Sequence, residues 1–161
     1  MKKIILLAFI AFTSFTNAQA FKGKGDVKGQ VGVSLQDGGT GIHISSDFGI
    51  GENISLGLQT SFLLSSGHGQ INDVKFKDRI DFKGRFNANI GNVLNLDKKI
   101  DIYPGLDLGL KNFGAHLGAR YFFTDGFGVY TEAGIPLAKY NQNDADFNNQ
   151  FVFNIGACFN L

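Results

Sequence analysis

Apolar and polar residues alternate along most of this chain with a period of two. In the stretch ARYFFTDGFGVYTEAG, residues 119–134, Tyr121 and Phe123 share one parity, whereas Arg120 and Glu132 share the other. Successive side chains of a β-strand point to opposite faces, so this alternation predicts strands with one apolar and one polar face. The alternation alone does not say which face meets a core.

Eight segments carry this pattern, and each is followed by a turn signal. We predict strands at 27–36, 41–50, 54–64, 80–90, 100–110, 113–123, 127–138 and 150–161. Their lengths match the ~9–11 tilted residues with which a β-strand crosses a bilayer. After the first twenty residues, no segment reaches the ~18 uninterrupted apolar residues of a membrane helix. The 161 residues are enough for one domain.

The predicted connections suit antiparallel hairpins. Two of them are three-residue loops with a residue able to adopt positive φ, one is a Gly-rich reversal and one is a two-residue turn. In that order they are Gly51-Glu52-Asn53, Thr124-Asp125-Gly126, Asp37-Gly38-Gly39 and Lys111-Asn112. The stretches 65–79 and 139–149 are longer and polar, and 91–99 is long for a turn at the opposite end. Short turns at one end and long loops at the other are typical of outer-membrane barrels.

Sorting the eight strands by parity separates charge from apolar bulk. The polar face carries Lys28, Asp47, Asp81, Lys83, Arg85, Asp101, Asp107, Arg120 and Glu132, and the apolar face carries no charge. Glycine follows the charged face, apart from Gly29 and Gly84. Small residues relieve crowding on a concave inner wall, and an eight-stranded barrel is just wide enough to be filled by side chains. The large apolar side chains would overfill it, so we predict that they point outward.

An outward apolar face fits a lipid environment. In hydrocarbon every backbone N–H and C=O must be paired, which requires a closed barrel. A Lys or Arg facing lipid at the midplane costs about 2–4 kcal/mol. We therefore predict an all-β protein, an eight-stranded antiparallel up-and-down transmembrane β-barrel in which the segment 150–161 pairs with 27–36.

The first twenty residues are predicted to be a signal peptide, leaving 21–161 as the barrel domain. Lys2 and Lys3 precede the apolar run 4–12, and Ala18-Gln19-Ala20 provides small residues for cleavage after Ala20, with a cut after Ala18 as the alternative. The remaining chain has 13 basic residues (15 less two in the leader) and 14 acidic ones. This balance gives no indication of nucleic-acid binding. Cys158 is the single cysteine, so no intramolecular disulfide can form.

The hairpin around Thr124-Asp125-Gly126 leads to specific expectations. Phe122 should lie opposite Gly128 on the inside, where an aromatic ring covers a glycine. Arg120 and Glu132 become diagonal neighbours that are able to pair in the lumen. The aromatic side chains of the apolar face should cluster at one end as an interfacial girdle, and they are Tyr121, Phe123 and Phe127.

The sequence RYFFTDGFGVYTEAG and the C-terminal strand resemble small eight-stranded outer-membrane barrels of the Bacteroidota type, which are OmpA/OmpX-like and largely uncharacterised. The last eight residues match their assembly signal at Asn154, Gly156, Phe159 and Leu161, although Leu161 stands where an aromatic residue is commoner. The resemblance implies that the outer-membrane barrel-assembly machinery reads this strand by β-augmentation. It covers essentially the whole chain after the leader.

Other candidate sites have weaker support from the sequence. His43 and His116 both point inward, but from strands on opposite sides of the ring, so we expect polar packing rather than a shared metal. His68 lies near Ser65 and Ser66, residue types that an acyl-transfer site uses, but no nucleophile elbow is present. Asp144 and Asp146 lack EF-hand spacing. We predict no catalysis, cofactor or metal.

The sequence therefore predicts a monomeric integral protein of the bacterial outer membrane with a structural or surface-interaction role. Its expected partners are the lipid bilayer, the assembly machinery and a surface ligand bound through the loops 65–79 and 139–149. Three alternatives remain at this point: a secreted soluble β-barrel that binds an apolar ligand, a lipid-modifying outer-membrane enzyme, and a narrow pore. The luminal charges are expected to form a closed plug.

Overall fold

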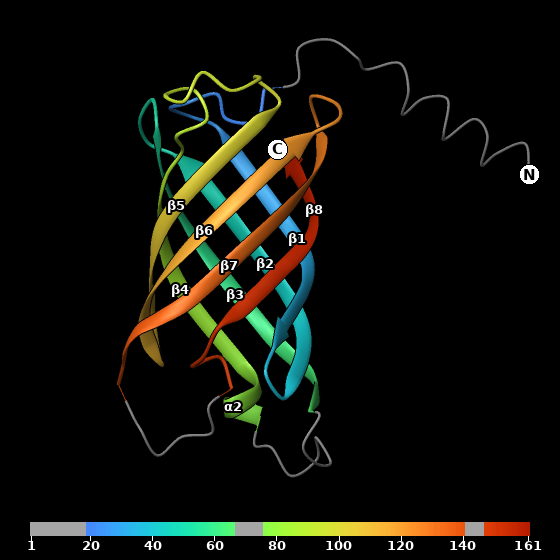
Figure 1. Cartoon of the computed structure of the whole chain (residues 1–161), viewed down its shortest axis with the longest axis vertical. Coiled ribbons are helices and arrows are strands. Elements are labelled where there is room, and N and C mark those ends of the chain that lie inside the picture. The colour runs from blue at the N-terminus through green and yellow to red at the C-terminus, as the bar shows by residue number, and fades with distance from the viewer. Residues whose placement is uncertain (1–18, 67–75, 141–146) are drawn as a thin grey trace, which may run out of the picture.

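The computed structural model describes residues 19–66, 76–140 and 147–161, which form a closed antiparallel barrel (Figure 1). The eight strands neighbour one another in chain order. They are β1 (Val27–Gln36), β2 (Gly39–Gly49), β3 (Ile54–Ser66), β4 (Ile80–Ala88), β5 (Ile100–Gly109), β6 (Asn112–Phe122), β7 (Phe127–Lys139) and β8 (Val152–Asn160). The predicted fold is confirmed, and each predicted strand boundary lies within two residues of the observed one.

Pairing of β8 with β1 closes the ring. The register runs from Lys28 opposite Asn160 to Gln36 opposite Val152. Two glycines, Gly32 and Gly156, face each other in this seam. A Cβ on Gly156 would overlap the carbonyl oxygen of Val31, so only glycine fits there without a backbone shift. The packing of the seam therefore requires Gly156, one of the residues of the predicted assembly signal.

The two ends of the barrel differ (Figure 1). β1 begins and β8 ends at the same end, together with the connections 50–53, 89–99 and 123–126. The opposite end carries the turn after β1 and a four-residue helix, α2 (Phe76–Arg79), which with the end of β3 occupies part of the predicted loop 65–79. In the described part of the chain, no helix is long and apolar enough to cross a membrane.

Three of the predicted turns differ in detail. Neither three-residue loop contains a residue with positive φ. Among the described residues that connect strands, positive φ occurs at Gly38 (69°) in the turn after β1 and at Asn95 and Asn148 in the longer connections. In the hairpin before β7, Thr124 Oγ1 instead accepts a hydrogen bond from the backbone N–H of Phe127 at 3.1 Å, which closes the turn. The remaining turn comprises residues 110–111 rather than 111–112, because Asn112 already pairs with Lys139.

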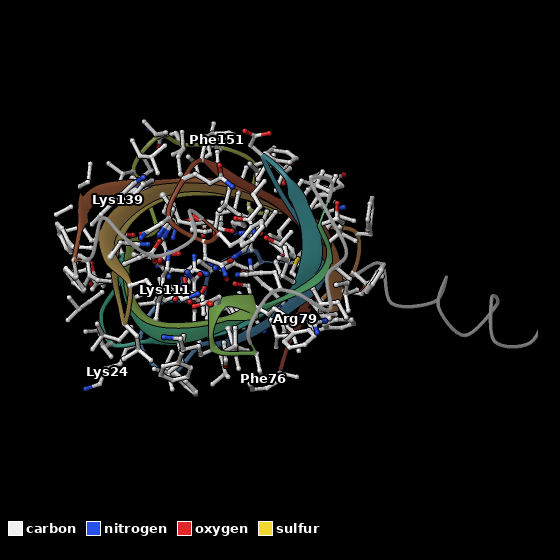
Figure 2. The ribbon with its side chains drawn as sticks, turned by 90° about the horizontal axis from the view of Figure 1, so that it is seen from below. Lys24, Phe76, Arg79, Lys111, Lys139 and Phe151 are labelled. Carbon is white, nitrogen blue, oxygen red and sulfur yellow. The ribbon has the colours of Figure 1, made fainter. Side chains whose placement is uncertain are left out.

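The apolar parity points outward, as predicted. Viewed along the barrel axis, nitrogen and oxygen atoms concentrate inside the ring and carbon-rich side chains surround it (Figure 2). Val33, Leu58 and Ile135 are 44%, 52% and 50% exposed. Among the described strand residues, one charged side chain is exposed, that of Lys139 at the end of β7. The exterior is therefore an apolar band without charge along the middle of the strands.

An aromatic cluster lies on this exterior at the end where the chain finishes. The ring centroids of Tyr121 and Phe123 are 5.1 Å apart, and those of Phe123 and Phe127 are 6.2 Å apart. Phe159 joins them because it pairs with Phe127 across β7 and β8, with centroids 5.7 Å apart. The predicted cluster is confirmed and extends onto the last strand.

The segment before β1 closes the barrel at the same end. The backbone N–H of Ala20 donates to the carbonyl of Lys98 at 2.7 Å, and Ala20 packs in a buried cluster with Phe122, Tyr130 and Cys158. Phe122 pairs with Gly128 as predicted. The long connection 89–99 thus provides the carbonyl that holds Ala20 in place. We call residues 19–26, which precede β1, the N-terminal plug.

Candidate functional site

All nine charged residues of the predicted luminal network point into the barrel. Eight of them are at most 4% exposed, and the side chain of Lys83 is 14% exposed. They come from six of the strands, β1, β2, β4, β5, β6 and β7. Buried charges are tolerated when they are paired and hydrogen-bonded, so the partners of each residue decide what this interior can do.

Two arginines organise the centre of the lumen. Arg85 on β4 reaches Glu132 on β7, with Nη2 and Oε2 2.5 Å apart, and Asp47 on β2, with Nε and Oδ1 3.3 Å apart. Arg120 on β6 pairs with the other oxygen of Asp47, and its Nη1 lies 3.8 Å from Asp101 Oδ2. The Arg120–Asp47 pair joins strands on opposite sides of the ring and Arg85–Glu132 joins strands three apart, so these side chains reach across the lumen and fill it.

The predicted pairing of Arg120 with Glu132 is wrong. Both side chains are luminal, but Glu132 contacts Arg85, and Arg120 contacts Asp47 and Asp101. The prediction was based on neighbours on adjacent strands. In a narrow barrel, long side chains such as those of arginine also reach partners on strands across the lumen.

Tyr103 is a central residue that the charge pattern did not identify. Both guanidinium groups lie over its ring, with Arg120 Cζ 3.9 Å and Arg85 Cζ 5.9 Å from the ring centroid. Its hydroxyl accepts a hydrogen bond from Gln30 at 3.1 Å, and Gln30 in turn accepts one from Ser45 at 2.6 Å. A cation over an aromatic face is stabilised by the ring quadrupole. The sequence offered one signal for this residue: Tyr103 lies two positions from Asp101, so it falls on the polar face of its strand.

The two luminal histidines are linked through Gln59 and Arg85. His43 Nε2 contacts Gln59 Oε1, which accepts a hydrogen bond from Arg85, and Arg85 Nη2 lies 3.1 Å from His116 Nε2. Their other partners differ. His43 Nδ1 lies 2.8 Å from the Tyr130 hydroxyl, whereas His116 Nδ1 lies 2.9 Å from Asp107 Oδ1. The second histidine also contacts Asn87, with Nε2 2.8 Å from Oδ1. In the described residues there is no group of three or more His, Cys, Asp and Glu that could hold a metal ion.

The remaining charged pairs lie toward the two ends. Lys28 Nζ is 2.5 Å from Asp26 Oδ2 in the N-terminal plug and lies over the Phe122 ring, 5.4 Å from its centroid. Toward the end with α2, Lys83 Nζ is 3.4 Å from Asp81 Oδ2. The ion pairs therefore extend along the length of the barrel rather than lining an open path.

A short segment crosses the barrel mouth at the end with α2. The backbone N–H of Asn148 donates to Gln36 Oε1 at 2.7 Å, and its carbonyl accepts from Asn112 Nδ2 at 2.8 Å. Ser61 Oγ donates to Asn148 Oδ1 at 3.2 Å, and Asn149 is also buried. We call residues 147–150 the crossbar. At the end of the predicted surface loop 139–149, Asn148 and Asn149 are therefore buried, and their amide groups bind luminal side chains.

Beneath the crossbar lies a small polar cavity of about 30 Å³. Seven of the eight strands, all except β6, contribute to its lining together with the crossbar. The polar residues of the lining include Ser34, His43, Gln59, Ser61, Asp81, Lys83, Asp107, Glu132, Asn148 and Asn154. A cavity of this size has room for about two water molecules. It is too small and too polar for an apolar ligand.

The residues of the predicted assembly signal lie in and after β8. Asn154 is 5% exposed and points inward, Gly156 faces Gly32, and Phe159 faces outward in the aromatic cluster. The N–H of Leu161 donates to the carbonyl of Val27 at 3.0 Å. In the closed barrel this strand is fully paired, so recognition through its edge would have to precede closure.

Three other candidate residues lie outside the described part of the chain. They are His68, Asp144 and Asp146. Ser65 and Ser66 fall at the end of β3. The suggested acyl-transfer and calcium sites therefore stay predictions from the sequence.

These features define a small closed β-barrel with an apolar exterior and an ion-paired interior. The chain belongs to a protein family described as "Family of unknown function (DUF6646)", whose model matches residues 9–161. A solved structure titled "De novo design of transmembrane beta-barrels" is similar in fold, with a TM-score of 0.52 and 13% sequence identity over 87% of this chain and 98% of that chain. No curated protein matches the chain.

The Arg85–Glu132 pair can be tested with a double-mutant cycle. Arg85→Met or Glu132→Gln leaves a buried partner without its counter-charge, and we expect each to lower the free energy of unfolding by about 3–5 kcal/mol. The double variant should lose less than the sum of the two. Urea unfolding of the detergent-folded barrel measures these changes, and Glu52→Gln in an exposed turn is the control. Additive losses would contradict direct pairing.

Proposed function

We propose that this protein is an integral β-barrel of the bacterial outer membrane with a structural or surface-interaction role and no catalysis. The observation that carries the proposal is the division of side chains between the two faces of the barrel. Its exterior exposes large apolar groups such as Phe82 and Phe86, while the charged groups of the described strands lie inside, apart from Lys139 at the end of β7. Water would make such an exterior strongly unfavourable, and lipid hydrocarbon would not.

The interior supports a plugged barrel over the three alternatives. A soluble barrel that binds an apolar ligand needs an apolar cavity, whereas here the lumen is filled by Arg85, Arg120 and their partners. The same groups and the N-terminal plug obstruct a narrow pore. For the lipid-modifying enzyme, the described residues do not include the whole candidate site. Its candidate His68 lies outside them.

The proposed partners follow from the surface. The bilayer would contact the apolar band, and the assembly machinery would read β8 before it pairs with β1. A surface ligand would bind at the end with α2, through the loops 65–79 and 139–149. At this end Phe76 is 67% exposed outside the ring (Figure 2), and Arg79 stacks on Phe62, with Cζ 4.6 Å from the ring centroid. We propose a monomer as the functional unit.

Membrane extraction and gel migration test the proposal together. The chain expressed with its leader should be found in the outer-membrane fraction and should require detergent for extraction. Unheated in SDS it should migrate as a compact species, and after boiling more slowly, because a closed barrel resists SDS until it is heated. In planar bilayers the purified barrel should give no steady conductance. Recovery in the periplasm or medium without detergent would contradict the membrane proposal, and stable single-channel currents would contradict the plug.

A cleaved signal peptide is part of the same proposal, and the barrel favours one of the two cleavage sites. Ala20 is 1% exposed and its N–H bonds to Lys98, so removing Ala20 would take away part of the plug. Cleavage after Ala18 leaves these contacts in place.

We therefore expect the mature protein to begin at Gln19. Intact-mass measurement of the chain purified from outer membranes determines this directly. An N-terminus at Phe21 would contradict the expectation, and retention of the first eighteen residues would contradict signal-peptide cleavage itself.

A further inference from the structure

The cavity beneath the crossbar contains more hydrogen-bond acceptors than its neighbours satisfy. Ser34 Oγ, Asp81 Oδ1, Asp107 Oδ1 and Asn154 Oδ1 are buried and have no hydrogen-bond partner in the described residues, whereas the lining has one such donor, Asn148 Nδ2. The four residues with free oxygens are 2%, 4%, 4% and 5% exposed. Ser34 and Asn154 face each other across β1 and β8, so two of these oxygens lie side by side on one wall. Buried polar atoms without a partner are rare and costly, and each needs an explanation.

The charge of the lining points to a cationic occupant. Three carboxylates line the cavity, those of Asp81, Asp107 and Glu132, against the single ammonium of Lys83. Glu132 is neutralised by Arg85. Asp107 Oδ1 lies 2.9 Å from His116 Nδ1 but accepts no hydrogen bond. Asp81 holds Lys83 through Oδ2 at 3.4 Å, which leaves Oδ1 unpaired. Negative charge in excess is unfavourable inside a wall that faces hydrocarbon, because the low dielectric strengthens the repulsion.

The size and donor set restrict the class of ligand further. A volume of about 30 Å³ admits a small ion with one water but no organic molecule of several heavy atoms. The free groups are hard oxygen donors, which suit alkali and alkaline-earth ions. In the described residues no group of three or more His, Cys, Asp and Glu is arranged for a metal ion, so the multi-carboxylate set that divalent ions prefer is not available.

We propose that this cavity is a binding site for one small monovalent cation, an alkali metal ion or ammonium, held between Asp81 and the oxygens of Ser34 and Asn154. The cation bridges the wall formed by β1 and β8 to β4 on the other side of the ring. The crossbar covers it through Asn148. The site lies between the crossbar and the luminal side chains of Arg85 and Arg120. The cation therefore enters from the end with α2 and does not pass through the barrel.

Lys83 gives the proposal a distinctive consequence. Its ammonium group already contacts Asp81 and therefore competes with a bound cation. Removing this charge with Lys83→Gln should strengthen cation binding, whereas removing the carboxylate with Asp81→Asn should abolish it. If both residues served only to stabilise the fold, the two substitutions would lower stability in the same way and neither would change the response to cations.

The test measures the melting temperature of the mature chain folded in detergent. Sodium chloride or ammonium chloride is raised stepwise, and N-methyl-D-glucamine chloride at the same ionic strength provides a cation too large for the cavity. At ten times the dissociation constant a small cation should raise the melting temperature by about 3–5 °C relative to the large one. In Lys83→Gln the half-maximal concentration should fall severalfold. Asp37→Asn, an exposed carboxylate at the same end, should respond as the unmodified chain does.

Equal melting temperatures in the small and large cations would overturn the proposal, as would a sodium or ammonium response that persists in Asp81→Asn. Ser34→Ala, which removes one oxygen without changing charge, provides a second variant and should weaken the response. Compact migration of each unheated variant shows that its barrel is closed. The proposal depends on the proposed function only through this closed barrel, so a failure of the cation test would leave the membrane location unaffected.

Discussion

Segregation of charge by strand parity is the constraint on which this barrel depends. A residue that moved by one position along a strand would exchange faces, and one Lys or Arg at the lipid midplane costs about 2–4 kcal/mol. The nine luminal charges lie on a single parity in strands that differ in sequence and length. The constraint on register is strongest for β4 and β5, which carry three and two of these charges, because a shift of one residue would expose all of them to lipid at once.

Placing the charges inside creates a second requirement, which is to pair them in a narrow space. Arg85 and Arg120 satisfy it by sharing Asp47, and both guanidinium groups also contact the Tyr103 ring. Glycines make room for this layer: a Cβ on Gly118 would collide with the Tyr103 ring. The abundance of glycine on the polar face is therefore a packing requirement of the large luminal side chains. The resulting interior is filled by ion-paired side chains, which supports the proposal of a plugged barrel over that of a narrow pore.

The fold and the identity of the luminal residues could be predicted from the sequence, because both depend on a period of two that is visible in one dimension. Phe122 opposite Gly128 was predictable for the same reason, since the hairpin fixes its partner. The pairs within the lumen could not be predicted. Whether Glu132 meets Arg85 or Arg120 depends on side-chain reach across the ring, which strand order does not specify. The crossbar was also not predictable, because Asn148 and Asn149 lie in a polar stretch without periodicity and bind through contacts distant in sequence.

Site-directed spin labelling tests most directly which medium meets the apolar face. In a chain with Cys158 replaced by Ala, single nitroxides at Leu117 and Ala119 on β6 report the outward face, and one at Glu52 reports the exposed turn. In lipid vesicles, Leu117 and Ala119 should collide readily with dissolved oxygen and rarely with a water-soluble nickel chelate, and Glu52 should show the reverse. Ready collision of the nickel chelate with the labels at Leu117 and Ala119 in vesicles would mean that water meets this face, and the barrel would then not be a membrane protein.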